Sequence, residues 1–421
     1  MEVRGFVDEI RDLGGLKFIK LNTSNGYLQI TVKKKEVSKD VLDKVEKITR
    51  QSVISVQGEL KKSKEAPGGH EIIPEKVDVL SVAETPLPLD PSGKTSAELD
   101  TRLDWRPLDL RSPRNRAIIR IQSKIVEGME EYLRKEGFTQ VFTPCIIGAA
   151  SEGGSEVFSV TYFDKEAFLR QDPQLHRELT IAGGIPKIFD LGPSWRAELS
   201  HTVRHTCEHR GCAVELAYIK DETDTMRVEE QLIVNAFKKV QEDCKEDLEV
   251  LDKQIEVPKT PFPELSFPQI YDVLDSFGKK YKRGLEDYDR ESEVLLYNYV
   301  KEKHKNDFFF VNKFPFAVKP FYVMRVDDDQ TWARSVDMIY KGIELSSGGQ
   351  REHRYDKLME QVKLKGLTNE SVEWFTKYFR YGIPPMGGFC IGVERLVMQM
   401  LDVKNIREIM LFPRTPERLL P

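Results

Sequence analysis

The chain has 421 residues, of which 32% are charged and 40% hydrophobic, and its formal net charge is −5. This composition indicates a globular protein of two or three domains and excludes a disordered or collagen-like chain. No apolar run approaches the ~20 residues of a membrane span, and the first residues do not form a secretory signal. The five cysteines are odd in number and form no CxxC pair, so we expect a cytoplasmic protein without membrane association.

Residues 1–85 predict a small first domain. Five short segments alternate between apolar and polar residues: Val3–Val7, Lys17–Leu21, Tyr27–Val32, Val53–Leu60 and Ile72–Leu80. A helix that begins at Ser38 fits between the third and fourth of these strands. Five strands with a helix after the third is the order of the OB-fold, a small oligonucleotide-binding barrel, so we predict a five-stranded OB-fold β-barrel here.

Phe18 in the predicted barrel stands between Lys17 and Lys20 in the sequence. An exposed aromatic ring with neighbouring cations is suited to stacking on unpaired nucleic-acid bases. A core position for the Phe18 ring fits the pattern equally well, so the pattern alone leaves both interpretations open.

The chain after residue 85 divides into a hinge and a larger domain. Residues 86–112 are rich in proline at their start and in arginine and aspartate at their end, which predicts an irregular linker. Residues 113–421 form the predicted second domain, whose first helix begins at Ser112-Pro113 and ends at Gly137. Similar patterns predict a strand over Phe138–Phe142 and helices over Thr223–Glu246 and Glu293–Glu302.

The stretch Gly192–Ile219 is expected to form two strands joined by a long polar loop. Arg196 and Glu198 are two positions apart on the predicted first strand and therefore project from the same face. The remaining charged and polar side chains of the stretch include Arg204, His205, Glu208, His209 and Arg210. A fixed cation beside a cationic loop suits a polyphosphate whose charge grows during displacement, and a solvated hairpin with a charged tip is the alternative.

Two acids in the last third, Asp337 and Glu344, lie in the segment Ser335–Glu344, which alternates like a single strand. Acids in an apolar setting fit a divalent metal bound together with phosphates, and two salt-bridged surface acids fit equally well. Arg351 follows two glycines, where its guanidinium could read a carboxylate with two hydrogen bonds. The segment Gly387–Arg395 leads from a strand into a helix and carries Arg395 near the helix start.

The same polar stretch also gathers soft metal ligands: His201, His205, Cys207, His209 and Cys212. Ligands this close together could hold zinc. Their spacing is not that of a familiar zinc finger or ribbon, so zinc is the weaker interpretation.

Three motifs resemble the signatures of class II aminoacyl-tRNA synthetases: WRAE at Trp195–Glu198, GGFCIGVERL at Gly387–Leu396, and Pro144 after the first helix and strand. ELSSGGQREHR, PPMGGF, TRLDWRPLDLR and the final LFPRTPERLLP are similar to the aspartyl/asparaginyl branch of archaeal and eukaryotic type. The resemblance spans essentially the whole chain in colinear order. It implies an α+β fold, with the OB-fold barrel followed by an antiparallel six-stranded catalytic sheet flanked by helices, and a homodimer built partly on the Pro144 segment.

The resemblance also implies a set of site residues. Those implied to bind ATP are Arg196, Glu198, Arg204, His205, His209, Glu344 and Arg395, with Arg196 and Arg395 as the catalytic pair. Those implied to organise Mg²⁺ are Asp337, Glu344 and Ser347. Those implied to bind the substrate amino acid are Ser151, Glu152, Gln174, Arg177, Ser347 and Arg351. Those implied to meet anticodon bases of tRNA are Phe18, Gln29 and Glu71.

The implied activity is ATP-dependent activation of L-aspartate to aspartyl-adenylate, followed by transfer to tRNA(Asp). Arg177 stands where the aspartate enzymes of the family carry lysine and the asparagine enzymes carry an uncharged residue. A second cation beside Arg351 favours a carboxylate over an amide, so aspartate is preferred to asparagine. Pro67 occupies a barrel position where strict enzymes tend to have lysine, which leaves tRNA(Asn) open as a second acceptor.

Five positions depart from the family pattern: Asp172 for serine, His209 for phenylalanine, Ala213 for an acid, Met386 for histidine and Cys390 for glycine. The acid absent at position 213 belongs to the site that receives the substrate ammonium. The alternatives to an aspartate enzyme are therefore an asparaginyl-tRNA synthetase, a paralogue that activates an acidic amino acid without charging tRNA, and a nucleic-acid-binding module without catalysis.

Overall fold

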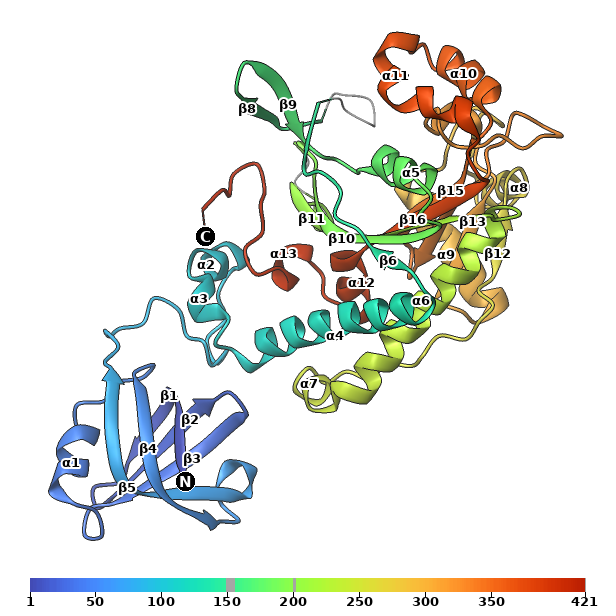
Figure 1. Cartoon of the computed structure of the whole chain (residues 1–421). Coiled ribbons are helices and arrows are strands. Elements are labelled where there is room, and N and C mark those ends of the chain that lie inside the picture. The colour runs from blue at the N-terminus through green and yellow to red at the C-terminus, as the bar shows by residue number, and fades with distance from the viewer. Residues whose placement is uncertain (149–155, 200–201, 421) are drawn as a thin grey trace. The chain divides into compact units, whose positions relative to one another are not determined.

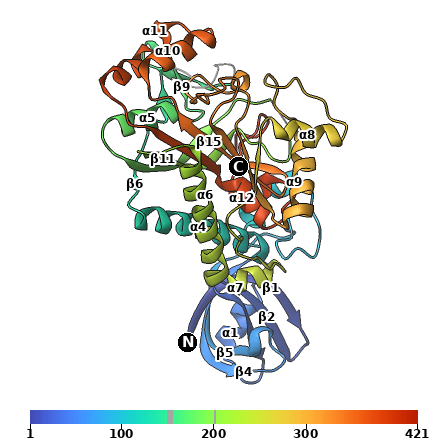
Figure 2. The ribbon, with the colours of Figure 1, turned by 90° about the vertical axis from the view of Figure 1, so that its right-hand side faces the viewer.

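The computed structural model describes residues 1–148, 156–199 and 202–420, and the chain forms two compact units, Met1–Pro113 and Arg114–Pro421. Figure 1 shows the ribbon with its element labels, and Figure 2 shows the same ribbon turned by 90°. Among the described helices, none combines the length and the apolar character that a membrane crossing requires.

The first unit contains a closed barrel with the strand order β1-β2-β3-β5-β4. Its strands are β1 (Glu2–Asp12), β2 (Leu16–Thr23), β3 (Gly26–Lys33), β4 (Val53–Lys62) and β5 (His70–Ser81). Helix α1 (Lys39–Val45) follows β3, and the Ser38 side chain caps it by accepting a hydrogen bond from the Val41 N–H. The five-stranded OB-fold predicted from period-two alternation is therefore confirmed.

The barrel is followed within the same unit by two short helices, α2 (Leu99–Asp104) and α3 (Arg106–Asp109). Asp109 receives hydrogen bonds from Arg102 at 2.9 Å and from Arg106 at 2.5 Å. The dense arginine and aspartate pattern of this segment thus forms ion pairs within the segment itself.

The second unit is built on an eight-stranded sheet with the order β12-β13-β14-β15-β16-β11-β10-β6. Its strands are β6 (Thr139–Gln140), β10 (Lys187–Trp195), β11 (Glu208–Ala217), β12 (Glu264–Ser266), β13 (Phe308–Asn312), β14 (Ser335–Tyr340), β15 (Ile343–Arg351) and β16 (Met386–Gly392). The six strands from β13 to β10 are antiparallel, and β12 and β6 add short parallel edges. The predicted antiparallel catalytic sheet is confirmed, with these two edge strands added.

One face of this sheet is apolar and is covered by helices α4 (Pro113–Lys135), α6 (Glu222–Asp243) and α12 (Val393–Met400) (Figures 1 and 2). Alternate residues of β11 and β16 supply it: Cys212, Val214, Leu216, Phe389 and Ile391. The residues between them, Ala213, Glu215 and Cys390, project to the opposite face because successive strand residues alternate. That opposite face carries the polar groups of the pocket described below.

The remaining elements of the second unit surround the sheet. They are the short strands β7 (Ile146–Ile147), β8 (Ser159–Tyr162) and β9 (Lys165–Leu169), and the helices α5 (Gln174–Ala182), α7 (Lys245–Val250), α8 (Gln269–Ser276), α9 (Arg290–His304), α10 (Tyr355–Leu364), α11 (Asn369–Thr376) and α13 (Ile406–Ile409). Helices α5, α10 and α11 share a second apolar cluster, and α8 and α9 share a third with β13.

Three local predictions differ from the structure. The segment Ser335–Glu344 is a hairpin rather than one strand, because Lys341 and Gly342 take positive φ values of 47° and 73° and reverse the chain. Strand β10 ends at Trp195, so Arg196 lies just beyond it, although its N–H still donates to the Cys207 carbonyl at 3.0 Å. The strand predicted over Phe138–Phe142 is only the two-residue β6, since it pairs with β10 at two positions.

Candidate active site

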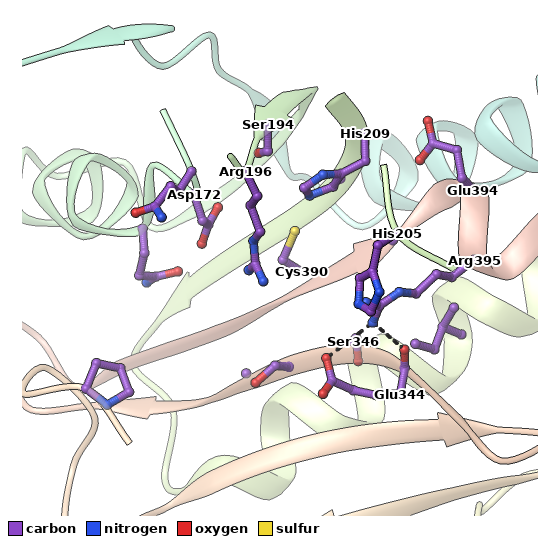
Figure 3. Close-up of a pocket in the computed structure, with 18 of the residues that line it drawn as sticks. Asp172, Ser194, Arg196, His205, His209, Glu344, Ser346, Cys390, Glu394 and Arg395 are labelled. Atoms are coloured by element: carbon purple, nitrogen blue, oxygen red, sulfur yellow. Dashed lines mark hydrogen bonds and ion pairs between the residues drawn. The ribbon is translucent and has the colours of Figure 1, made fainter. Parts of the chain in front are cut away.

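One open pocket lies on the polar face of the sheet (Figure 3). The loop between β10 and β11, strands β15 and β16, and the start of α12 all contribute to its wall. Every residue predicted to bind ATP lines this pocket: Arg196, Glu198, Arg204, His205, His209, Glu344 and Arg395. Three residues predicted for the amino acid, Gln174, Ser347 and Arg351, line it as well.

Two guanidinium groups reach into the pocket from different elements. Arg196, just after β10, has its Nη1 3.7 Å from Oε1 of Glu198, and its side chain is 43% exposed. Arg395, in the first turn of α12, donates from Nη1 to the Glu344 carbonyl at 2.8 Å and lies 3.5 Å from the Glu344 carboxylate. In the view of Figure 3, Arg196 lies between Asp172 and this Arg395–Glu344 pair. The two cations therefore approach one cavity from two sides.

The histidines of the pocket are held neutral. Burial, and then the charges of Arg196 and Arg395, lower the pKa of His209 to about 4. Burial, and then Arg395, also lower the pKa of His205, whose Nδ1 lies 2.5 Å from the Thr202 hydroxyl oxygen. A neutral imidazole at position 209 offers a flat ring surface in place of the phenylalanine that the resemblance leads one to expect.

The loop cation Arg204 is tied to helix α9. Its Nη1 donates to Oε2 of Glu293 at 3.2 Å, and the other oxygen of Glu293 accepts from the backbone N–H of Glu344. The Arg204 and Glu293 side chains are 17% and 7% exposed. One buried carboxylate thus joins the polar loop to the start of β15.

Two of the residues predicted to hold a metal, Asp337 and Ser347, contact each other. Asp337 on β14 pairs in register with Ser347 on β15, and the Ser347 side chain donates a hydrogen bond to it. Burial, opposed by Lys319 and reinforced by Glu344, raises the pKa of Asp337 to about 7. Lys319 Nζ lies 3.3 Å from Oδ2 of Asp337. A buried carboxyl in this state would gain from an additional cation.

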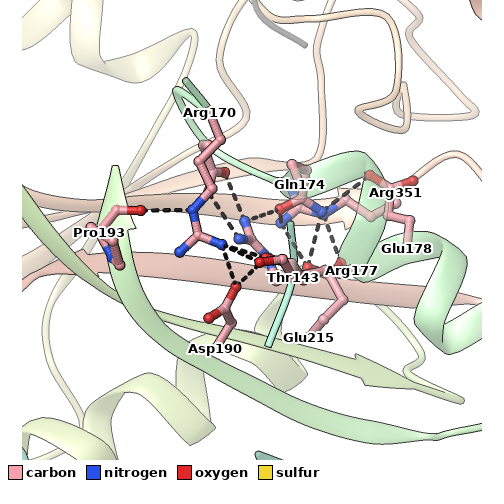
Figure 4. A network of polar contacts seen from close by, with 10 residues as sticks. Thr143, Arg170, Gln174, Arg177, Glu178, Asp190, Pro193, Glu215 and Arg351 are labelled. Carbon is pink, nitrogen blue, oxygen red and sulfur yellow. Dashed lines mark hydrogen bonds and ion pairs between the residues drawn. The ribbon is translucent and has the colours of Figure 1, made fainter. Parts of the chain in front are cut away.

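Arg351 at the end of β15 belongs to a fully buried polar network (Figure 4). Its Nε donates to Oε1 of Glu215 at 2.9 Å, and its Nη2 donates to Oε2 of Glu215 at 3.3 Å and to Oε1 of Gln174 at 3.1 Å. Gln174 Nε2 in turn donates to Glu215 at 3.0 Å and to Glu178 at 3.1 Å. Within the described part of the chain, Nη1 of Arg351 has no hydrogen-bond partner, so this group can meet a ligand.

Arg177 lies behind the pocket wall and is joined to Asp172. Its Nη1 and Nη2 donate to the two oxygens of Asp172 at 2.8 and 2.7 Å, and Nη2 also donates to Gln174 Oε1 at 2.7 Å. The Asp172 side chain is 19% exposed and lines the pocket, whereas the Arg177 side chain is 1% exposed. Arg177 therefore reaches the cavity through Asp172 and Gln174 in this structure.

A second network fixes the strand that leads to Arg196 (Figure 4). Arg170 donates from Nε to the Pro193 carbonyl at 2.7 Å and from Nη1 to the Thr143 hydroxyl at 2.6 Å and to Asp190 at 3.2 Å. Gly192 has no side chain, which leaves room for the Arg170 guanidinium. The buried Arg170, which directly follows β9, thus holds the end of β10 that leads to Arg196; its carbonyl also accepts from the Trp195 N–H at 2.9 Å.

Some predicted residues lie elsewhere or cannot be placed. Ser151 and Glu152 lie outside the described residues, and so does His201 of the zinc alternative. Among the residues that the structure does describe, no three His, Cys, Asp or Glu side chains gather as they would around a metal ion. Arg170, Glu215, Glu293 and Lys319 contribute to the site but had no predicted role in it. Of these, only Glu215 carried a signal, as the single acid in the otherwise largely apolar segment Cys212–Ile219.

The three residues predicted to meet anticodon bases come together on the barrel wall. Gln29 on β3 pairs in register with Glu71 on β5, and Gln29 Nε2 donates to Glu71 Oε2 at 3.1 Å. Phe18 on β2 pairs with Thr31, whose hydroxyl donates to the same Glu71 oxygen at 2.5 Å. Phe18 is partly exposed, which fits a stacking surface better than a core position.

The chain matches two family models. Residues 98–416 match the tRNA synthetases class II (D, K and N), and residues 1–80 match the OB-fold nucleic acid binding domain. Among curated relatives, the aspartate--tRNA(Asp) ligase of Pyrococcus furiosus is 44% identical, and the alignment covers 100% of this chain and 96% of the relative. The aspartate--tRNA(Asp/Asn) ligase of Methanopyrus kandleri is 43% identical with the same coverage, 100% and 96%.

Solved structures show the same architecture. The asparaginyl-tRNA synthetase from Pyrococcus horikoshii, complexed with asparaginyl-adenylate, has a TM-score of 0.91 and 33% identity and covers 100% of this chain and 96% of its own. The aspartyl-tRNA synthetase from Entamoeba histolytica has a TM-score of 0.90 and 30% identity and covers 100% and 89%. The likeness thus extends over both units.

A pH measurement tests the neutral state of His209. Its pKa is near 6.5 in an unfolded chain and about 4 in the fold, so between these values the unfolded chain binds more protons and stability rises with pH. The variant His209→Phe removes this pH dependence, which changes the free energy of unfolding by at most ~1.4 kcal/mol per pH unit. Urea denaturation at pH 5 and pH 7 should therefore show a smaller pH response in His209→Phe than in the wild type, with the exposed His304→Phe as control. An equal response would show that His209 is protonated in the fold.

Proposed function

The chain belongs to the class II tRNA synthetases of the D, K and N group, and from this membership we propose that it is an aspartate--tRNA ligase. It activates L-aspartate with ATP and transfers the aspartyl group to tRNA(Asp), with tRNA(Asn) as a further acceptor to be tested. The observation that carries the proposal is one pocket in which Arg196 and Arg395 stand at the nucleotide end and Arg351 stands at the amino-acid end. Relatives of both the tRNA(Asp) and the tRNA(Asp/Asn) kind support it.

At the nucleotide end, each pocket residue receives a role that suits its chemistry. We assign the α-phosphate to Arg196 and the adenine amino group to Glu198. Arg204 and His205 would meet the outer phosphates, and the neutral ring of His209 would stack on the adenine. Arg395 would meet the γ-phosphate and also contact the adenine ring. Fixed guanidinium groups are suited to these positions, because the negative charge that develops on displacement is stabilised without reorganisation.

At the amino-acid end, Arg351 is the group we propose to read the substrate side chain. Its Nε and Nη2 are held by Glu215 and Gln174, and its Nη1 remains available to a carboxylate. Ser151, Glu152 and Gln174 are proposed to receive the ammonium, and Ser347 to lie beside the substrate. Arg177 is proposed to act here through its bonds to Asp172 and Gln174.

The activation step then needs no protein base. The α-carboxylate of the amino acid is already ionised, attacks the α-phosphorus of ATP in line, and expels pyrophosphate. The terminal ribose hydroxyl of tRNA next attacks the mixed anhydride and releases AMP. Catalysis is positioning together with neutralisation of charge by Arg196 and Arg395.

Mg²⁺ is part of the proposal, because the residues present fit it. Asp337, Glu344 and Ser347 offer the oxygen ligands that Mg²⁺ prefers, and the raised pKa of Asp337, about 7, marks a carboxyl that a cation would stabilise. When bound, the ion would neutralise charge on the ATP phosphates. Two carboxylates are enough, since Mg²⁺ sites of this kind take their other ligands from phosphates and water.

Three further parts of the proposal concern the whole protein. The barrel residues Phe18, Gln29 and Glu71 would meet the anticodon bases. The chain would form a homodimer on the Pro144 segment, where Phe142 is 84% and Ile146 is 44% exposed. The free state of all five cysteines is consistent with a location in the reducing cytoplasm.

Amino-acid-dependent exchange of labelled pyrophosphate into ATP tests the reaction. We expect exchange with aspartate and, with asparagine, a kcat/KM lower by roughly 10²-fold, because an amide cannot pair with Arg351 as a carboxylate does. Charging of tRNA(Asp) and tRNA(Asn) transcripts is measured next. We expect tRNA(Asp) to be charged, and the second transcript tests whether tRNA(Asn) is a further acceptor. Exchange with asparagine alone would make the chain an asparaginyl enzyme, and exchange without charging would make it a paralogue that only activates. Tight tRNA binding without any exchange would refute the proposal that the chain is an enzyme.

The variant Arg196→Ala tests the assignment of the α-phosphate. Adenylate formation should fall by roughly 10²-fold or more, as is usual when a main charge stabiliser is removed. Arg210→Ala is the matched control, because Arg210 lies on the adjacent strand and pairs with Glu208 at 2.9 Å. Near-normal exchange in Arg196→Ala would mean that the loop cations, rather than Arg196, carry the phosphate.

A further inference from the structure

The amino-acid end of the pocket contains a carboxylate with no assigned role, that of Asp172. Among the described residues, four carboxylates line the pocket: Asp172, Glu198, Glu344 and Glu394. Glu198 pairs with Arg196, Glu344 with Arg395, and Glu394 accepts the backbone N–H of Arg210 at 3.0 Å. Asp172 differs from them, because Arg177 and Gln174 join it to Arg351.

The neighbouring strand position offers no negative charge. Ala213 on β11 is 3% exposed and pairs in register with Cys390 on β16, and Cys390 lines the pocket. Asp172 lines the same pocket as Cys390, and its charge, after burial, raises the pKa of the Cys390 thiol to about 12. A cationic group that enters here therefore finds no acid at position 213, and Asp172 is the carboxylate that lines this end of the pocket.

Asp172 is also built to stay ionised. Burial works against its charge, but Arg177 and, after it, Arg351 and Arg196 together outweigh burial and lower the pKa of Asp172. Arg177 donates one hydrogen bond to each oxygen of Asp172, which fixes the orientation of the carboxylate. The pair therefore holds an oriented anion at the edge of the cavity.

We propose that Asp172 binds the α-ammonium of the substrate amino acid, with Arg177 as the positioning residue that holds Asp172 in place. This inference rests on the proposed function, since it names a residue of the same site. It adds Asp172 to the groups proposed above for the ammonium and leaves the side-chain carboxylate to Arg351, so that the two charges of the substrate meet the two ends of one hydrogen-bonded chain through Gln174. A charge-assisted hydrogen bond of this kind is strong, so its loss should be measurable.

The test compares aspartate with succinate, which is aspartate without its amino group. In the full chain, Asp172→Asn should raise the KM for aspartate in pyrophosphate exchange by about 10- to 100-fold, from the loss of a hydrogen bond to a charged group. The KM for ATP and the inhibition constant of succinate should not rise. If Asp172 only competes with substrate for Arg177, the variant should instead bind aspartate and succinate more tightly by the same factor, which would overturn the proposal.

A second variant separates the ammonium role from a folding defect. Asp172→Asn combined with Arg177→Gln removes both charges and leaves no unpaired ion in the interior. This double variant should keep the wild-type KM for ATP. Its KM for aspartate should still rise relative to the inhibition constant of succinate. Recovery of the wild-type KM for aspartate would show that Asp172 serves only to neutralise Arg177. A wild-type protein without any exchange would refute the proposed function itself, which is a different result.

A separate observation, the contact of Arg204 with Glu293, assigns a role to α9. We infer that Glu293 is a positioning residue for Arg204. Its carboxylate accepts from Arg204 and from the Glu344 backbone, and Glu344 in turn holds Arg395. The loop and the strand that border the phosphate end are thereby tied to one buried group on a helix outside the pocket. This inference also rests on the proposed function, in which Arg204 meets the outer phosphates.

A double-mutant cycle tests Glu293. Glu293→Gln keeps an acceptor for the Glu344 N–H but loses the ion pair, so the KM values for ATP and pyrophosphate should rise by about 10-fold while the KM for aspartate stays within twofold. In an Arg204→Gln background the same change should have little further effect. Glu291→Gln on the same helix, whose side chain is 73% exposed, is the control. An equal loss in both backgrounds, or a matching rise in the KM for aspartate, would overturn the inference.

Discussion

The buried pair of Arg351 and Glu215 is the constraint on which the proposed amino-acid site depends. A guanidinium that has left water is stable only with a counter-charge and satisfied hydrogen bonds, and Glu215 supplies both. The two residues lie on β15 and β11, and β16 runs between these strands. Gly388 on β16 makes this possible, because any side chain there would collide with the Glu215 carboxylate. The sheet thus fixes Arg351 from one side and leaves Nη1 for the substrate.

The proposed nucleotide end is arranged by the same rule, and two of its three pairs are weaker. Each of its three cations has an acid beside it: Glu198 for Arg196, Glu293 for Arg204 and Glu344 for Arg395. These pairs hold the guanidinium groups near their working positions before a ligand arrives, which lowers the reorganisation that binding requires. The pairs of Arg196 and Arg395 are partly exposed and hence weak, so the larger charge of a polyphosphate can compete with them.

The parts of this structure that the sequence predicted are those with a local signal. The barrel strands follow from period-two alternation, α1 from its Ser38 cap, and the pocket cations from colinear motifs. The hairpin at Lys341-Gly342 was missed, because apolar alternation continues across the turn and only the positive φ values reveal it. Arg170, Glu215 and Glu293 could not be assigned, because their partners are 20 or more positions away and only the fold brings them together. Asp172 was noticed as a departure, but its bond to Arg177 could not be predicted.

The ion pair of Asp172 with Arg177 changes the argument for aspartate as the substrate. Taken alone, Arg177 adds a positive charge that favours a carboxylate, but Asp172 cancels it. Among the described residues, the network around Arg351 then contains two cations, Arg177 and Arg351, and two carboxylates in ion pairs with them, Asp172 and Glu215. Burial raises the pKa of the third carboxyl, Glu178, and so favours its neutral form. A site without net charge favours a ligand whose buried groups also have charges that sum to zero. The ammonium and side-chain carboxylate of aspartate do so, whereas asparagine would bring an uncompensated positive charge, so the preference for aspartate now rests on balance rather than on a second cation. Glu152, which lies outside the described residues, is the one predicted acid that this balance does not count.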